Sequence, residues 1–154
     1  MIKRMPPELA DQVLAIWLSE TAKAHPFIPN AYWAKNFMKV KTRLLPASET
    51  YVCVEGGQLK GFLSILDGNY IGALFVSEEF QGQGVGARLM EHVMDQYDEL
   101  TLDVYAENTR AVEFYERCGF YREDEGINEE TDHLEYKMSW ISSDMEELLF
   151  GMQC

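Results

Sequence analysis

Hydrophobic positions early in the chain recur at helical spacing. Four of them lie on one side of a helical projection: Leu9, Val13, Ile16 and Trp17. This spacing predicts an amphipathic helix with one buried face. Pro6 and Pro7 suit its first turn, where proline is tolerated. Residues 2–4, just before it, are expected to form a short first strand.

A second helix is predicted between Asn30 and Pro46. Asn30 is a good N-cap residue, and Pro46 is expected to end the helix. Three large apolar residues would occupy its inner face: Trp33, Phe37 and Leu44. The intervening segment 25–29 contains two prolines, which cannot continue a helix, so it predicts a loop.

The pattern changes after residue 49. Residues 50–55, 59–66 and 70–76 are rich in strand-forming side chains. Short turns separate them, with Gly56-Gly57 in the first and Gly68-Asn69 in the second. Three strands joined by short glycine turns predict an antiparallel meander.

The second half returns to alternating elements. Residues 85–97 keep helical spacing, and residues 100–105 predict a strand. Asn108 is expected to cap a helix over residues 109–118, which Gly119 would end. A strand, a helix and a further strand in this order imply a right-handed parallel crossover.

The last two strands are predicted at residues 120–122 and 133–140, joined by the acidic segment 123–132. The element order is then β-α-α-β-β-β-α-β-α-β-β, an α/β protein with a mixed sheet and helices on its faces. We expect one domain over residues 1–140. The tail 141–154 predicts at most one short amphipathic helical turn.

Composition excludes several classes of protein. The 154 residues include 13 basic and 26 acidic side chains, a formal net charge of −13. Nucleic acid binding needs cations, so no nucleic-acid partner is expected. The acidity suits a cationic partner better than nucleic acid, although solubility alone also explains it. No apolar run approaches the ~20 residues of a membrane helix and no signal peptide is evident, so we expect no membrane contact and a cytoplasmic location.

Cysteine and histidine usage argues against metal. The three cysteines are odd in number and form no CxxC pair, so neither a disulfide framework nor a zinc site is expected. His92 and His133 have no companions at metal-ligand spacing. We therefore expect no bound metal.

The stretch 81–87, QGQGVGA, lies between a predicted strand and a predicted helix. Glycine lets the backbone come close to a ligand, and the free N–H groups and dipole of a helix start favour an anion. The stretch therefore predicts a phosphate cradle. A glycine-rich turn without a ligand is the plainer alternative.

A dinucleotide fingerprint also fits here. Gly82, Gly84 and Ala87 match GxGxxA, and Asp103 follows about 20 residues on. In that fold the strand runs directly into the first glycine, whereas residues 77–81 intervene here. Asp103 also falls in the middle of a predicted strand. We regard this match as accidental.

The same stretch fits QxxGxG through Gln81, Gly84 and Gly86. A second motif, N-x-x-A-x-x-F-Y-x-x-x-G-F, follows at the right separation and fits these residues: Asn108, Ala111, Phe114, Tyr115, Gly119 and Phe120. With these two motifs and its element order, the chain resembles the GNAT (Gcn5-related) N-acetyltransferases over residues 1–140. The run from Trp17 to Trp33 resembles a small bacterial subgroup thought to acetylate protein lysines.

The resemblance implies acetyl-CoA as co-substrate and gives each motif residue a role. The backbone N–H groups of seven residues would hold the pyrophosphate of coenzyme A: Gln81, Gly82, Gln83, Gly84, Val85, Gly86 and Ala87. Three strand residues would pair with its pantetheine arm: Leu74, Phe75 and Val76. The Val76 N–H would lie near the thioester oxygen. Asn108 would bond the coenzyme arm, with Ala111 beside it, and Tyr115 would protonate the departing thiolate.

The resemblance also implies an acceptor site. Four residues lie where the family has its acceptor-binding loop: His25, Phe27, Ile28 and Tyr32. Simple hydrophobic packing is the alternative for them. Some family members have a catalytic carboxylate where this chain has Tyr70, and a neutral tyrosine is a poor base. Tyr70 is kept as a candidate for the catalytic site and for the acceptor tunnel, with Asp67, His25 and Glu107 as weaker candidates for a base acting through water.

The leading hypothesis is direct attack of a neutral amine on the thioester in a ternary complex, without a covalent enzyme intermediate. The amine would belong to a protein lysine, a protein N-terminus or a small molecule. The alternative is a non-catalytic acyl-CoA sensor, motivated by the missing carboxylate at position 70 and by the tail. A monomer and a homodimer remain equally open.

Overall fold

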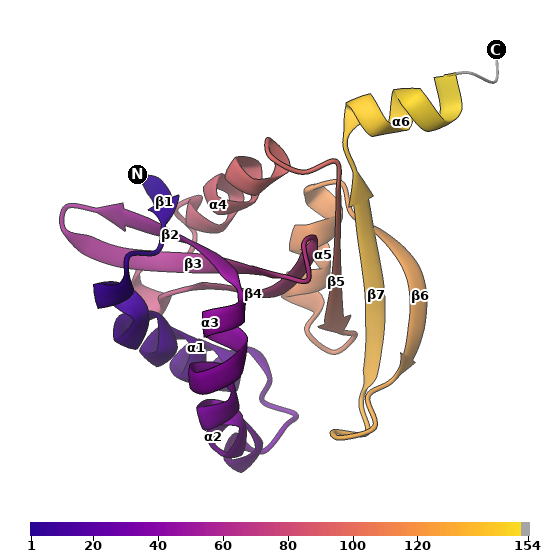
Figure 1. Cartoon of the computed structure of the whole chain (residues 1–154). Coiled ribbons are helices and arrows are strands. Elements are labelled where there is room, and N and C mark those ends of the chain that lie inside the picture. The colour runs from indigo at the N-terminus through magenta and orange to yellow at the C-terminus, as the bar shows by residue number, and fades with distance from the viewer. Residues whose placement is uncertain (152–154) are drawn as a thin grey trace. The chain divides into compact units, whose positions relative to one another are not determined.

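The structure, a computed structural model, describes residues 1–151 and is shown in Figure 1. The chain divides into two compact units, Met1–Met90 and the part from Glu91 onward. The elements follow the order predicted from the sequence, with short helical segments and one terminal helix added. No helix among residues 1–151 is long and apolar enough to cross a bilayer.

The first unit contains a four-stranded antiparallel sheet. Its strands lie in the order β1 (Ile2–Arg4), β2 (Glu49–Glu55), β3 (Gln58–Leu66) and β4 (Tyr70–Val76). The meander predicted from the glycine turns is therefore confirmed. In β4, Ala73 faces Ser64 and Ile71 faces Ile65, so Gly72 is the extra residue of a β-bulge.

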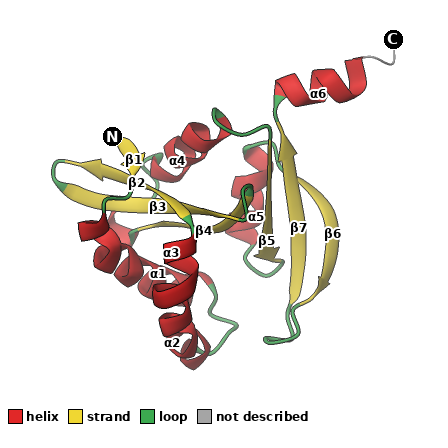
Figure 2. Ribbon diagram, viewed as in Figure 1, coloured by secondary structure: helices red, strands yellow, loops and turns green. Residues whose placement is uncertain are grey.

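Helices of the first unit flank this sheet (Figure 2). They are the 3-10 turn η1 (Pro7–Leu9), α1 (Ala10–Ala24), α2 (Asn30–Lys39), the π-helical segment η2 (Val40–Leu44), α3 (Leu45–Ala47) and the 3-10 turn η3 (Glu78–Phe80). Helix α4 (Val85–Met94) begins in this unit and ends in the second. Helix α1 packs on β3 and β4. Val13, Val52 and Phe62 form a buried cluster between α1 and the sheet. Burying side chains of this size contributes ~1.5–3 kcal/mol each, which holds α1 to the sheet.

Two predictions about the second helix are wrong. Asn30 is its first residue and Pro29 is the N-cap, with no side-chain capping bond. Pro46 does not end the helical run, because it lies in the first turn of α3, which continues to Ala47. Only Ala47 follows Pro46 in this run, so the missing N–H of the proline affects its last turn alone.

The second unit contains a three-stranded antiparallel sheet in the order β5 (Glu99–Tyr105), β7 (Leu134–Ile141) and β6 (Tyr121–Ile127). Helix α5 (Thr109–Arg117) contacts β5. The predicted N-cap is confirmed, since the Asn108 side chain accepts a hydrogen bond from the Ala111 N–H at 3.3 Å. Gly119 has a φ of +103°, which suits its place after the last turn of α5.

Several boundaries in this half differ from the prediction. Helix α4 ends at Met94 rather than Tyr97. Strand β6 extends to Ile127, into the acidic segment that was expected to be a loop. It lies at the outer side of this sheet and is exposed along its length, so acidic side chains cost little there. Glu123 also accepts a 2.6 Å hydrogen bond from the Ser139 hydroxyl of β7.

The tail forms a longer helix than expected. Helix α6 spans Ser143–Phe150, and the Ser142 hydroxyl caps it by accepting a 3.0 Å bond from the Met145 N–H. Ser142 also donates from its backbone N–H to the Asp98 carbonyl at 2.7 Å. Leu148, Leu149 and Phe150 are exposed. The last predicted tail residues, 152–154, lie outside the described residues.

Candidate active site

The glycine loop has the backbone geometry of an anion site. Gly82 and Gly84 have φ values of +78° and +80°, which residues with a Cβ rarely adopt. Both are exposed, and no atom lies within 4 Å of where a Cβ would stand. Helix α4 begins directly afterwards, and the Arg88 N–H donates back to the Gly84 carbonyl at 3.0 Å. The preceding N–H groups therefore lie ahead of the first intrahelical bond, where a phosphate can accept from them.

The start of the loop is tied to the end of β4. The Gln81 amide donates to the Val76 carbonyl at 2.9 Å and to the Glu20 carboxylate at 3.2 Å. Glu20, at the C-terminal end of α1, is only 7% exposed. Lys23 lies 3.6 Å from Glu20 and 2.8 Å from Glu78. One amide thus fixes the strand end and the loop to α1.

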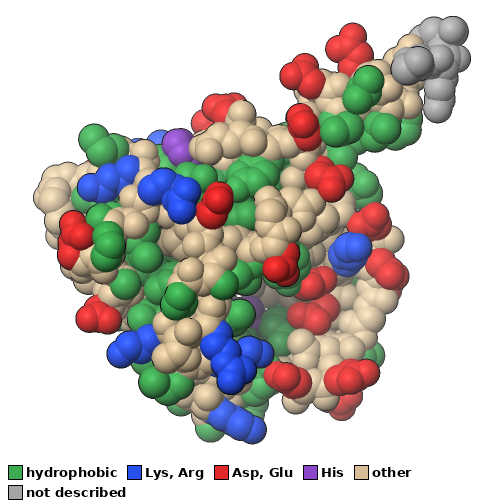
Figure 3. Space-filling model, viewed as in Figure 1, with side chains coloured by type: hydrophobic (Ala, Val, Ile, Leu, Met, Phe, Trp, Pro, Cys, Tyr) green, Lys and Arg blue, Asp and Glu red, His purple; other side chains and the backbone are tan. Residues whose placement is uncertain are grey.

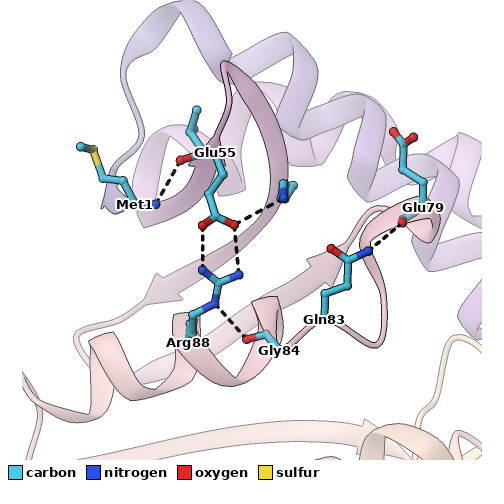
Figure 4. A network of polar contacts seen from close by, with 8 residues as sticks. Met1, Glu55, Glu79, Gln83, Gly84 and Arg88 are labelled. Carbon is cyan, nitrogen blue, oxygen red and sulfur yellow. Dashed lines mark hydrogen bonds and ion pairs between the residues drawn. The ribbon is translucent and has the colours of Figure 1, made fainter.

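A second network holds the other side of the loop (Figure 4). Arg88 on α4 makes a bidentate pair with Glu55 of β2, with N–O distances of 3.0 and 3.1 Å. Hydrogen bonding to Arg88, aided by Lys60, lowers the pKa of Glu55 to about 2. The Gln83 amide donates to the Glu79 carbonyl at 3.4 Å. Because the Arg88 guanidinium is engaged by Glu55, the groups that the loop offers to an anion are its backbone N–H groups.

Strand β4 leads into this loop. Leu74, Phe75 and Val76 pair with β3, and all three are partly exposed. Gly61 of β3 allows a close approach, because a Cβ there would stand 2.8 Å from the Phe75 carbonyl oxygen. Tyr70, the first residue of β4, pairs with Leu66. The bulge at Gly72 separates Tyr70 from the segment predicted to hold the pantetheine arm.

The other residues predicted to contact the coenzyme lie in the second unit, at the N-cap of α5 and on α5 itself. The side-chain Oδ1 of Asn108 accepts the capping bond, and its side-chain amide nitrogen can donate a hydrogen bond to a coenzyme. Ala111 supplies the capped N–H and has a small side chain. The Tyr115 ring makes edge contacts with Phe114 and Phe120 at centroid distances of 5.4 and 5.7 Å.

Tyr115 is held in its protonated form. Burial, and to a lesser extent the nearby Cys118, raises the pKa of its phenol well above the usual value. A phenol with a raised pKa keeps its proton throughout the physiological range, so Tyr115 is available there as a proton donor. Cys118 itself is a free thiol whose pKa is raised by burial.

The loop between α1 and α2 is built on aromatic contacts. The His25 ring lies 5.8 Å from Phe27 and 5.0 Å from Trp33, and Tyr32 lies 4.9 Å from Trp33, centroid to centroid. Ile28 is 2% exposed, and its N–H donates to the His25 carbonyl at 3.0 Å. Ile28 is therefore packed inside the first unit, and a role for it in acceptor binding stays a prediction.

His25 is a buried, oriented imidazole. Its Nδ1 lies 2.6 Å from the Thr21 carbonyl oxygen. A carbonyl only accepts, so Nδ1 carries the proton and the neutral ring has its lone pair on Nε2. Burial lowers the pKa of His25 below its ordinary value. The ring is thus neutral at physiological pH.

Two buried polar groups escaped the sequence analysis. Glu20 reads as a solvated charge on an amphipathic helix, and only the fold brings Gln81 to it. Trp33 reads as core, yet its indole Nε1 is buried with no hydrogen-bond partner among residues 1–151. Leaving such a donor unsatisfied costs ~1–3 kcal/mol. Within the same described range, no group of three metal-ligating side chains comes together.

Comparison with known proteins identifies the fold and the family. The model of the acetyltransferase (GNAT) domain matches residues 12–140. Peptidyl-lysine N-acetyltransferase YiaC of Escherichia coli (strain K12) is 35% identical over 128 residues, covering 83% of this chain and 88% of YiaC. The solution structure of apo YjaB from Escherichia coli is 27% identical with a TM-score of 0.79, covering 93% of this chain and 98% of YjaB.

The PaiA N-acetyltransferase of Thermoplasma acidophilum, solved in complex with coenzyme A, has the same fold. Its TM-score is 0.76 at 17% identity, over 92% of this chain and 98% of that protein. The fold is that of the acyl-CoA-dependent N-acyltransferases. The chain belongs to the GNAT family, and it is an N-acetyltransferase that transfers an acetyl group to an amine. The predicted family, mixed α/β fold class and type of enzyme are confirmed.

Proposed function

We propose that this chain transfers the acetyl group of acetyl-CoA to the side-chain amine of a protein lysine, by direct attack in a ternary complex. The main support for the coenzyme is the exposed glycine loop, where two residues with positive φ precede the start of α4. The main support for the acceptor is the name of YiaC, a peptidyl-lysine N-acetyltransferase, at 35% identity.

The coenzyme side relies on backbone groups. The N–H groups of residues 82–87 bind the pyrophosphate, and the positive end of the α4 dipole favours its negative charge. The Gln81 N–H, also predicted for this role, instead donates to the Glu78 carbonyl at 3.3 Å. Leu74–Val76 pair with the pantetheine arm, and the Val76 N–H stabilises the developing oxyanion. The Gln81 bonds to Val76 and Glu20 keep the oxyanion donor and the pyrophosphate loop in register. Asn108 adds a bond from its amide nitrogen.

The chemistry is acyl transfer from an activated ester. The lysine nitrogen forms a bond to the thioester carbon, and the C–S bond breaks as the tetrahedral intermediate collapses. Tyr115 gives its proton to the leaving sulfur, and the proton that the lysine nitrogen loses as the amide forms returns through water to the Tyr115 oxygen. The amine must be neutral to attack, although a lysine in water has a pKa of ~10.4, so a first proton has to leave the acceptor before the attack. His25, neutral and oriented by Thr21, accepts that proton through water in this proposal.

A non-catalytic acyl-CoA sensor remains the second candidate, because Tyr70 stands where some relatives have a carboxylate. A sensor would bind the coenzyme by the same loop without needing Tyr115. A cytoplasmic location, a monomeric or homodimeric state and the absence of a nucleic-acid partner stay predictions.

The first experiment is thermal unfolding with acetyl-CoA and, as control, with NAD. Ligand at 100 times its dissociation constant should stabilise the fold by about 2.7 kcal/mol, a shift of roughly 5–10 °C. A shift with acetyl-CoA alone supports the loop assignment. The matched activity assay compares an N-terminally blocked lysine peptide with its lysine-to-arginine counterpart by mass spectrometry. Acetyl-CoA binding without acetylation of any amine would favour the sensor, and no binding would refute both candidates.

A further inference from the structure

One segment of this acidic chain is rich in cations and free of acidic residues. Residues 30–48 contain Lys35, Lys39, Lys41 and Arg43 and no acidic residue. The remaining sequence holds the other nine basic residues and all 26 acidic ones. The segment is α2, η2 and α3, which form one nearly continuous helical run in the first unit. Figure 3 shows Lys and Arg side chains gathered in the region of these helices.

Three of the four cations form a row. Lys35, Lys39 and Arg43 are spaced four residues apart, so they share one side of the helical run. All three are exposed, and among residues 1–151 none of them takes part in an ion pair. We call this row the basic face. Like charges at this spacing repel one another, so the row does not stabilise the helix that carries it.

An apolar cavity of about 50 Å³ lies beside the basic face. Val40 and Leu44, each next in sequence to a cation of the face, line it together with Trp17 of α1, Phe62 and Leu66 of β3 and Ala73 of β4. Gly72, in the β4 bulge, also lines it and is exposed. Leu44 is 36% exposed, so the cavity reaches the surface beside Arg43.

The polar groups in the cavity wall are already satisfied. The Ser48 hydroxyl bonds the Leu45 carbonyl at 2.8 Å and the Thr50 hydroxyl at 2.8 Å, and Thr50 bonds Ser64 at 2.7 Å. What remains open is apolar. A cavity several times the size of a water site, with no unsatisfied polar partner, suits a small aliphatic side chain rather than ordered water.

We propose that the basic face and the adjacent cavity dock an acidic segment of the acceptor protein that carries one aliphatic side chain. The cations pair with the carboxylates of that segment, and the aliphatic side chain enters the cavity. This inference rests on the proposed function, because the docked segment belongs to the same polypeptide as the acceptor lysine.

The position of the cavity fits this role. Ala73 in its wall lies three residues before Val76 along β4, about 10 Å at the rise of a strand. A peptide anchored in the cavity therefore has its neighbouring residues within reach of the strand predicted to hold the thioester. The acceptor lysine is cationic in solution, so the cations of the basic face repel it. An acidic flank docked on the basic face therefore leaves the lysine directed away from that face.

Charge favours a short acidic peptide over larger anions. Interactions between exposed charges are screened beyond about 8 Å at physiological ionic strength. A short segment therefore responds mainly to the basic face. A lipid surface or a nucleic acid extends over a wider area, where it meets the acidic majority of this chain.

The test compares two short, N-terminally blocked peptides, each with one lysine and one leucine. One carries three glutamates beside the leucine, and the other carries three glutamines. The variant is the triple substitution Lys35→Gln, Lys39→Gln and Arg43→Gln. The matched control is Lys3→Glu with Arg4→Gln on β1, which changes the net charge of the protein by the same amount as the triple variant. We expect the wild type and the control to prefer the glutamate peptide. In the triple variant, the KM for the glutamate peptide should rise about five- to tenfold with kcat unchanged.

Further readouts separate the possible failures. High salt should remove the preference of the wild type, and the melting temperature of the triple variant should not fall. Fluorescence anisotropy of the glutamate peptide without acetyl-CoA measures docking even if no transfer occurs, so a failure of the proposed function is distinguishable. Equal KM values for wild type and triple variant would overturn the inference. The inference would also be overturned if the triple variant lost binding to phosphatidylglycerol vesicles with no change in the KM for the peptide. That result would show that the basic face binds lipid.

Discussion

The glycine loop and the loop between α1 and α2 differ in the groups that they expose: the first presents its backbone, whereas the second is held by buried side chains. Residues 82–84 are exposed and present backbone, with positive φ at Gly82 and Gly84. The α1–α2 loop buries two side chains, with His25 at 9% and Ile28 at 2% exposure. A backbone site needs only a short run of small residues before a helix. A side-chain site needs partners from distant elements, and so its chemistry depends on packing. We therefore expect substitutions in the two loops to affect different substrates.

The largest expected effect concerns the chemical step that both loops serve. Replacing Tyr115→Phe keeps the ring contacts with Phe114 and Phe120 and removes only the proton donor. We expect kcat to fall by about 10²–10⁴ with the dissociation constant for acetyl-CoA nearly unchanged. Steady-state kinetics and a thermal shift with acetyl-CoA measure the two quantities. Tyr121→Phe, at an exposed tyrosine of β6, is the control. An unchanged kcat would remove Tyr115 from the mechanism.

The next largest effect is expected from a substitution in the glycine loop, which should change the KM for acetyl-CoA. Gly84→Ala places a Cβ on a residue with φ of +80°, a conformation that costs ~1–2 kcal/mol for a residue other than glycine. If the loop must hold this conformation to bind pyrophosphate, the KM for acetyl-CoA should rise about tenfold. The KM for the acceptor should not change. Gly57→Ala, at φ of +75° in the β2–β3 turn, imposes similar strain away from the loop. Equal effects of both substitutions on coenzyme binding would contradict a role for the loop backbone.

The smallest effect concerns the acceptor loop and pH. Burial lowers the pKa of His25, so the unfolded chain takes up a proton at a higher pH than the folded one. The contribution of the neutral ring to stability is complete above pH ~6.5 and decreases as the pH falls toward the lowered folded pKa. Each pKa unit of lowering corresponds to ~1.4 kcal/mol. Chemical denaturation between pH 7.5 and 5 should show this loss in the wild type and a smaller loss in His25→Asn. His92→Asn is the control, and a loss that persists in His25→Asn would show that another group titrates.

The motif residues were predictable because their signals are local. The motifs Gln81–Gly86 and Asn108–Phe120 predict the loop or helix in which they lie. The structure has the predicted cap at Asn108 and positive φ values at the glycines of the loop. The contribution of Tyr70 and of the coenzyme contacts stays a prediction. So does the single domain over residues 1–140.

The errors share a physical cause. Asn30 and Pro46 were assigned by propensity, which tertiary packing of a long helical run overrides. The acidic residues of β6 predicted a loop because a run of charged side chains is unfavourable in a buried strand. β6 is exposed, and that exposure cannot be inferred from the local sequence. Glu20 and the Trp33 indole were missed because burial of a polar group is a property of the fold, not of its neighbours in sequence.

The amino-acid sequence by itself determined the element order, the glycine loop and the family, since hydrophobic period, helix caps and positive-φ glycines act over a few residues. Only the tertiary structure decided which side chains meet. It brought Gln81 to Glu20 and Val76, paired Arg88 with Glu55, and set a row of unpaired cations beside an apolar cavity. These contacts join residues up to 61 positions apart, and no local preference encodes such a distance.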